Sequence, residues 1–193
     1  CGLASVEQLL QDAPDAKTWT ETAQRWMFST ASAPQDNKDH LVFANDKTVA
    51  QLTGETFTAL PDYMAENHGM VHPNYTASSV LFTGYLGVIY GAYGAPVPKH
   101  AYFNRQKIYD QLKLTTDRTG SMHPVQGMDW PYLFTDPGTT THAAASILLN
   151  DADAARMELW ALETLEGRQD SNDGRMYDPE VAEVCHDVQD PMI

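Results

Sequence analysis

The segment from Thr76 to Gly94, TASSVLFTGYLGVIYGAYG, is the feature that most restricts how this chain can fold. Its apolar residues lie almost all round a helix, which is typical of a helix in the interior of an all-helical layer. Gly84, Gly87 and Gly91 would let other backbones approach it closely. Because glycines and tyrosines interrupt the apolar run, and a spanning helix needs roughly 18 apolar residues, the segment does not predict a membrane span. Three tyrosines on this helix are expected to be core residues with their hydroxyl groups satisfied at its rim: Tyr85, Tyr90 and Tyr93.

The residues before this segment predict a helical hairpin and a third, short helix. A helix over 5–13 would follow Ser5 as its N-cap, and a second would begin at Asp15. A helix over 47–54 would end at Gly54. The apolar face of the second helix would consist of Trp19, Ala23, Trp26 and Met27.

The residues after it predict four more helices, at 101–116, 141–150, 151–167 and 178–188. In the first of these, Ile108, Leu112 and Leu114 are expected to point inward, and Arg105, Lys107 and Lys113 largely outward. No alternating strand pattern longer than about four residues occurs, and no hairpin dipeptide separates two such runs. The sequence therefore predicts an all-α fold of antiparallel helix pairs, in a single helical domain over residues 1–193.

The charge balance argues against nucleic acid as a partner. The 193 residues include 12 basic and 26 acidic side chains, a formal net charge of −14, without any run of lysine or arginine. This field repels phosphates and anionic membrane surfaces, although a few local cations in a cleft could still hold an acidic ligand.

The ends of the chain bear on its location. The sequence cannot say whether Cys1 and Cys185, at opposite ends, form a disulfide. The chain starts without Met and without a leader, so we expect either a removed signal or a piece of a longer protein, secreted or periplasmic. A lipoprotein would also begin with Cys, but the helical pattern that follows at once favours the other readings.

Polar side chains that could carry chemistry are concentrated in three segments, at 66–76 (ENHGMVHPNYT), 117–136 and 139–142. Each lies just before an apolar helix or at its start. In antiparallel helical arrays such positions gather at one end, so these segments could line one cleft. Gly69 and Pro73 would turn the backbone so that Asn67, His68, His72 and Tyr75 face one space.

Three kinds of chemistry fit these residues. His68 and His72, with Glu66 close by, have a spacing suited to a metal site, but Gly69 and Pro73 make a continuous helix doubtful, and we predict no metal. Paired-carboxylate glycoside hydrolysis could use Asp62, Glu66 or Asp129, provided two of them lie roughly 5 to 10 Å apart.

The third chemistry is β-elimination from a uronic acid, which needs no metal or other cofactor. The sugar carboxylate must be neutralised so that the C5 proton becomes acidic, a base removes this proton, and an acid protonates the departing glycosidic oxygen. Asn67, His68 and Tyr75 offer these functions in one short stretch.

The ENHG sequence, followed by HPNYT at the entrance of an apolar helix, resembles the Asn-His-Gly segment of polysaccharide lyases of the heparinase II/III-like and alginate-lyase type. This resemblance implies an (α/α) toroid, or part of one, and a lyase that acts on a uronic-acid-containing polysaccharide. It makes Asn67 a donor that neutralises the carboxylate and His68 a neutraliser or base, with Tyr75 or Tyr132 as the acid/base tyrosine. The residues expected to bind substrate are His72, His123, Gln126, Asp129 and Trp130.

Simpler roles exist for some of these residues. Trp130 and Tyr132 are more often loop anchors than sugar platforms, and His123 and His142 each precede a helix and suit a cap or a loop hydrogen bond. Members of this family also have more helices and a β-sandwich that this chain has no room for, so further chain segments or subunits would complete the fold. The alternatives are a toroid glycoside hydrolase and a non-catalytic carbohydrate-binding or assembly subunit.

Overall fold

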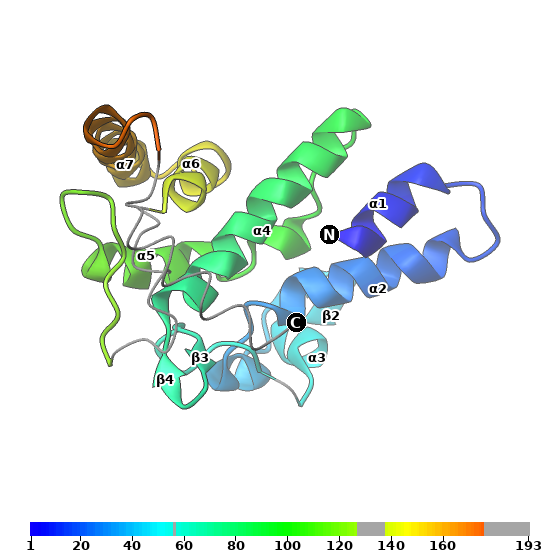
Figure 1. Cartoon of the computed structure of the whole chain (residues 1–193). Coiled ribbons are helices and arrows are strands. Elements are labelled where there is room, and N and C mark those ends of the chain that lie inside the picture. Colours follow the sequence, from blue (N-terminus) through cyan, green and yellow to red (C-terminus); the bar gives the residue numbers. More distant parts are fainter. Residues whose placement is uncertain (56, 127–137, 176–193) are drawn as a thin grey trace.

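The computed structural model describes residues 1–55, 57–126 and 138–175, and it is mostly helical, so the all-α prediction is confirmed (Figure 1). The elements, in chain order, are α1 (Gly2–Leu9), α2 (Ala16–Ser29), the 3-10 helix η1 (Pro34–Lys38), β1 (Val42–Ala44), β2 (Lys47–Thr48), α3 (Val49–Thr53), β3 (Glu66–Asn67), β4 (Met70–Val71), α4 (Pro73–Ala92), the 3-10 helix η2 (Lys99–Tyr102), α5 (Arg105–Thr115), α6 (Thr139–Leu148) and α7 (Ala152–Ser171). No helix of these residues is both long enough and apolar enough to cross a membrane.

The long helix α4 is the centre of the arrangement (Figure 1). It contacts α1 on one side and α5 and α6 on the other, while α2 packs on α1 and α7 packs on α6. Two hydrophobic clusters therefore share this helix. One is built mainly from α4, α5, α6 and α7 and consists of Ala31, Ala77, Val80, Ile108, Tyr109, Leu112, Met122, Ala144, Ala145 and Ala154. The other joins α1, α2, α4 and η2 and consists of Ala4, Ala23, Met27, Leu86, Tyr90 and Ala101.

The glycines of α4 allow the expected close packing, but the helix is not buried on every side. A Cβ atom at Gly84 would lie 2.9 Å from Cβ of Ala144 in α6. In contrast, Phe82 is 51% exposed and Val88 is 71% exposed, because the contacting helices leave this side of α4 open in the part of the chain described. The tyrosine prediction is right for one residue and wrong for two: Tyr90 is buried and donates to Glu7 Oε2 at 3.0 Å, whereas Tyr85 and Tyr93 are exposed.

The N-terminal hairpin α1–α2 forms as predicted, with different details. Because α1 begins at Gly2, Ser5 lies inside the helix and is not its N-cap. Ala23 and Met27 are buried, but Trp26 is 61% exposed, so it does not share their inward face.

Helix α5 differs from its prediction at two positions. Ile108 and Leu112 are buried as expected. Leu114 is exposed, because a residue two positions after Leu112 lies nearly on the opposite side of a helix. Arg105 is buried, although it was expected to point outward.

Two short β-hairpins are among the elements that the sequence did not predict. β1 pairs with β2 across Asn45 and Asp46, and β3 pairs with β4 across His68 and Gly69. All four turn residues have positive φ, as the two-residue turns of tight hairpins require. Their strands of two or three residues are too short for an alternating pattern to reveal them.

Candidate functional site

The ENHG stretch is a β-hairpin that ends at a tight turn. Asn67 lies opposite Met70, and the turn between them consists of His68 (φ 54°) and Gly69 (φ 82°). The Glu66 carboxylate accepts a hydrogen bond from Gly69 N at 2.5 Å, which closes the turn. Because His68 lies in this turn and not on a helix, it does not form the helical His-x-x-x-His pair that a metal site could use.

His72 connects the hairpin to α4. Its N–H donates to Ala65 O at 2.9 Å, and Ala65 N donates to Thr76 Oγ1 at 2.7 Å. The imidazole is 0% exposed and contacts the Tyr75 ring edge to face, with 4.7 Å between the ring centroids. His72 therefore lies inside the protein at the beginning of α4, and a substrate could not reach it without movement of its neighbours.

The three predicted catalytic residues in the described structure lie on the hairpin and on the first turn of α4. His68 is exposed at the tip of the turn, and Tyr75 is 39% exposed. Asn67 is half-buried, and its Nδ2 has no hydrogen-bond acceptor among the residues described. A buried amide nitrogen without an acceptor costs roughly 1–3 kcal/mol, so a ligand oxygen that reached it would recover this energy.

Hydrogen bonds join the first polar segment to the second and the second to the third. Val71 N in the hairpin donates to Gln126 Oε1 in the second segment at 2.8 Å. His142 Nε2, in the third, donates to Gly120 O in the second at 2.9 Å. Gln126 therefore fixes the hairpin through its side chain. The remaining predicted residues of this second segment, Asp129, Trp130 and Tyr132, lie outside the described residues, as does Cys185.

The histidines of the second and third polar segments, His123 and His142, have structural partners. His142 is fully buried, and its Nδ1 lies 2.9 Å from the hydroxyl of Tyr109. His123 is exposed, and its Nε2 lies 2.7 Å from Asp117 Oδ2. These contacts agree with the simpler roles that the sequence left open for both.

Two of the carboxylates proposed for glycoside hydrolysis, Glu66 and Asp62, accept hydrogen bonds from nearby backbone groups. Glu66 closes the hairpin turn, and Asp62 Oδ1 accepts from Met64 N at 3.0 Å. Within 1–55, 57–126 and 138–175, no three His, Cys, Asp or Glu side chains gather where they could hold a metal ion.

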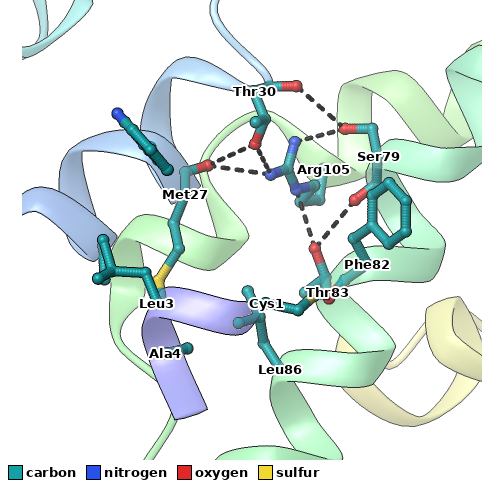
Figure 2. A pocket seen from close by; sticks show the side chains of 12 residues that line it. Cys1, Leu3, Ala4, Met27, Thr30, Ser79, Phe82, Thr83, Leu86 and Arg105 are labelled. Carbon is teal, nitrogen blue, oxygen red and sulfur yellow. Dashed lines mark hydrogen bonds between the residues drawn. The ribbon is translucent and has the colours of Figure 1, made fainter. Parts of the chain in front are cut away.

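Arg105 is the residue that sequence reasoning missed. Its side chain is only 2% exposed, and it enters the space between α2 and α4 (Figure 2). It shares a helical face with Ile108 and Leu112, three and seven positions later, and this spacing was the available signal. Burial lowers the pKa of its guanidinium to about 9, which still leaves the group cationic at neutral pH. Its hydrogen-bond acceptors are Thr83 Oγ1, Ala101 O, Met27 O, Thr30 Oγ1 and Ser79 Oγ.

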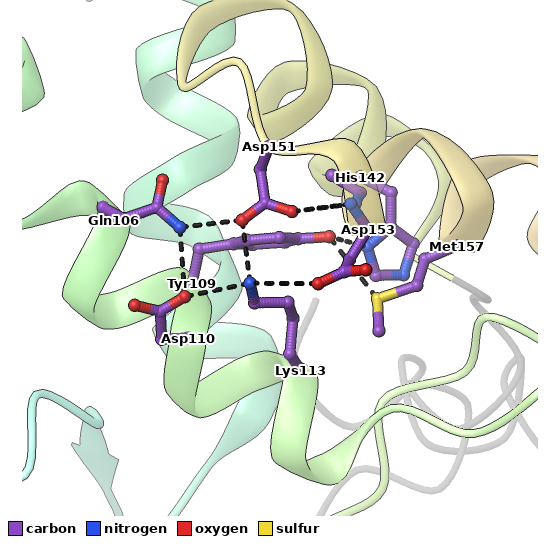
Figure 3. Close-up of polar contacts among 9 residues, drawn as sticks. Gln106, Tyr109, Asp110, Lys113, His142, Asp151, Asp153 and Met157 are labelled. Atoms are coloured by element: carbon purple, nitrogen blue, oxygen red, sulfur yellow. Dashed lines mark hydrogen bonds and ion pairs between the residues drawn. The ribbon is translucent and has the colours of Figure 1, made fainter.

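A second charged cluster surrounds Lys113, whose ammonium group is paired with aspartates (Figure 3). Lys113 Nζ lies 2.8 Å from Asp151, 3.0 Å from Asp110 and 3.7 Å from Asp153. Although partial burial of Asp151 opposes ionisation, hydrogen bonds from Lys113 and Gln106 lower its pKa. This cluster connects α5 to the start of α7, and the aspartates neutralise the positive charge of Lys113, so Lys113 is a poor site for an anionic ligand.

Comparison with models of protein families, with curated proteins and with solved structures gave no match for this chain.

Proposed function

We propose that this chain is the helical part of a lyase that cleaves a uronic-acid-containing polysaccharide by β-elimination. The observation that carries the proposal is the Asn67 amide, whose Nδ2 lacks an acceptor within the described part of the chain and which lies next to the exposed His68 of the turn. A polymeric substrate is met outside the cytoplasm, so a secreted or periplasmic location belongs to the same proposal.

Each of the three residues has a chemical part in the reaction. Asn67 Nδ2 would donate to the uronate carboxylate, which makes the C5 proton more acidic. His68 would assist this neutralisation or take the C5 proton as a neutral imidazole. The electron pair of the broken C5–H bond forms the C4–C5 double bond as the C4–O bond breaks, and Tyr75 would protonate the departing oxygen.

His68 lies at the exposed tip of this turn, where its imidazole can meet a substrate from solution. Its positive φ belongs to the two-residue turn, as it does for Asn45 and Asp46 in the other hairpin. The helix pairs around α4 are compatible with a section of an (α/α) toroid, and further chain segments or subunits would complete that toroid.

The test is incubation of the protein with polygalacturonate, alginate and glycosaminoglycans, followed by the ultraviolet absorbance of the unsaturated uronide. We expect the absorbance to rise with wild type. His68→Asn keeps a residue that tolerates positive φ and removes the imidazole, so activity should fall by about 100-fold or more. Asn67→Asp replaces the amide donor with a charge that repels the uronate, and a loss of about 100-fold or more is expected.

The matched control is His40→Gln, because His40 is an exposed histidine between η1 and β1, outside the proposed site. It should retain wild-type activity, and circular dichroism should show all variants folded. Reducing ends that appear without absorbance would indicate a hydrolase. Binding without cleavage would indicate a carbohydrate-binding subunit. Either result would overturn the lyase proposal.

A further inference from the structure

An apolar cavity of about 260 Å³ lies between α1, α2 and α4 (Figure 2). Its apolar wall comes from side chains of all three helices, and Arg105 from α5 also lines it. It is partly open to solvent, and two of its lining residues, Phe82 and Trp26, are exposed. The apolar lining residues that matter for the argument are Leu3, Ala4, Met27, Phe82 and Leu86.

The Arg105 guanidinium is a buried positive charge in this wall without an acidic partner. Among the described residues, no carboxylate lies within ion-pair distance of it. Its hydrogen bonds go only to hydroxyl groups and backbone carbonyls, and they use one of the two N–H groups on Nη1. A charge kept out of water in this way is stabilised most by an anion with which it can form a hydrogen bond.

We propose that this cavity binds a small monocarboxylate with an apolar body, such as a medium-chain aliphatic acid. The apolar walls contact the body, and the carboxylate approaches Arg105. The combination of a largely apolar pocket with one oriented polar group is the usual form of a small-molecule site. The chain has 26 acidic side chains and a net charge of −14, yet none of the described carboxylates lies next to Arg105. The arginine is therefore available to a carboxylate that comes from a ligand.

The first test compares three probes by calorimetry with the 193-residue protein at pH 7. Octanoate has both the charge and the apolar chain, 1-octanol has the chain alone, and acetate has the charge alone. Because a hydrogen bond to a charged group strengthens binding by about ten-fold or more, octanoate should bind at least that much more tightly than octanol, and acetate should not bind measurably. Equal binding of octanoate and octanol, or no binding of octanoate, would overturn the proposal.

The second test places a charge on an exposed residue of the cavity lining that belongs to neither hydrophobic cluster. Phe82→Glu should weaken octanoate binding about five-fold or more by repulsion, relative to Phe82→Gln of the same size. Tyr85→Glu adds the same charge to an exposed position of α4 that does not line the cavity, and it should bind octanoate as wild type does. A Phe82→Glu variant that binds octanoate as tightly as Phe82→Gln would contradict the site.

Arg105 itself is tested by Arg105→Met, with folding followed by circular dichroism. If this variant folds, it should lose the preference for octanoate over octanol; retention of the preference would overturn the role of Arg105. If it does not fold, the comparison of octanoate binding by Phe82→Glu and Phe82→Gln tests the site. The inference does not depend on the lyase proposal, because His68 does not line the cavity. We therefore expect His68→Asn to leave octanoate binding unchanged.

Discussion

Asp117 shows how a few local contacts determine the ionisation of a single residue. Its Oδ1 accepts hydrogen bonds from Thr119 N at 2.7 Å and Thr119 Oγ1 at 2.6 Å, and its Oδ2 lies 2.7 Å from His123 Nε2. Partial burial alone would raise the pKa of Asp117. The hydrogen bonds from Thr119 and His123 outweigh it and lower the pKa to about 2.

The lowered pKa predicts how Asp117 contributes to stability as pH falls. The folded protein holds this carboxylate ionised below the ordinary value of 3.8, so the unfolded chain binds more protons in this range. The contribution is fully present above about pH 4 and is lost as the pH falls toward about 2. We therefore expect Asp117→Asn to lower the free energy of unfolding at pH 6, and the difference from wild type to shrink at acidic pH.

Urea unfolding at several pH values measures this difference. Asp12→Asn is the control, because Asp12 is an exposed aspartate in the connection between α1 and α2. If the free energies of unfolding of wild type and Asp117→Asn differ by the same amount at pH 6 and at about pH 2, the ionised Asp117 does not stabilise the folded protein in the predicted way.

Arg105 illustrates what sequence can and cannot predict about one residue. Its spacing in the helical pattern predicts that it lies on the inner face with Ile108 and Leu112. Its charge predicts instead that it points to solvent. The structure follows position, because oxygen atoms of α2 and α4 solvate the guanidinium. These oxygens lie more than twenty positions away in sequence, and no local pattern indicates that they meet there.

Elements with complete local signals were predictable, and elements that depend on turns were not. α3 has a capping box, in which Thr48 Oγ1 accepts from Gln51 N and the Gln51 side chain accepts from Thr48 N, and Gly54 ends it. The hairpin of β3 and β4 has two-residue strands, and it is stabilised by Gln126, 55 positions away from Val71. The sequence therefore pointed to the residues of the candidate site and to a turn of the backbone at Gly69, but not to the hairpin that carries them.

The packing of α4 against α6 predicts opposite effects for two substitutions of the same type. A methyl group at Gly84 would meet Cβ of Ala144 at 2.9 Å, whereas at Gly91 nothing lies within 4 Å. Overpacking typically costs roughly 1–3 kcal/mol, and the better helix propensity of alanine returns up to about 1 kcal/mol. We expect Gly84→Ala to destabilise the protein by about 1 kcal/mol, and Gly91→Ala to stabilise it by about 0.5 kcal/mol.

Denaturant unfolding of both variants at neutral pH measures these effects, and each variant serves as the control for the other. If Gly84→Ala has the same free energy of unfolding as Gly91→Ala, α4 and α6 do not pack as closely at Gly84 as described.

At the scale of the whole molecule, the excess of acidic side chains is the dominant electrostatic feature. The net charge of −14 destabilises the compact state through repulsion between carboxylates that are far apart. Close pairs act in the opposite sense: Lys113 lies within 4 Å of three aspartates, and Asp151 in this cluster is largely buried. Salt weakens the long-range repulsion more than it weakens such short, partly buried contacts.

Stability should therefore increase with ionic strength. Raising NaCl from about 10 mM to about 150 mM shortens the screening length from roughly 30 Å to roughly 8 Å, which removes most of the long-range repulsion. We expect a gain of about 1 kcal/mol, or about 2–4 °C in Tm for a chain of this size. Replacing the exposed Glu163 and Glu166 of α7 with glutamine removes two negative charges and should make the response to salt smaller. A Tm that falls with added NaCl would mean that close pairs such as Lys113–Asp151 contribute more to stability than the general repulsion takes away.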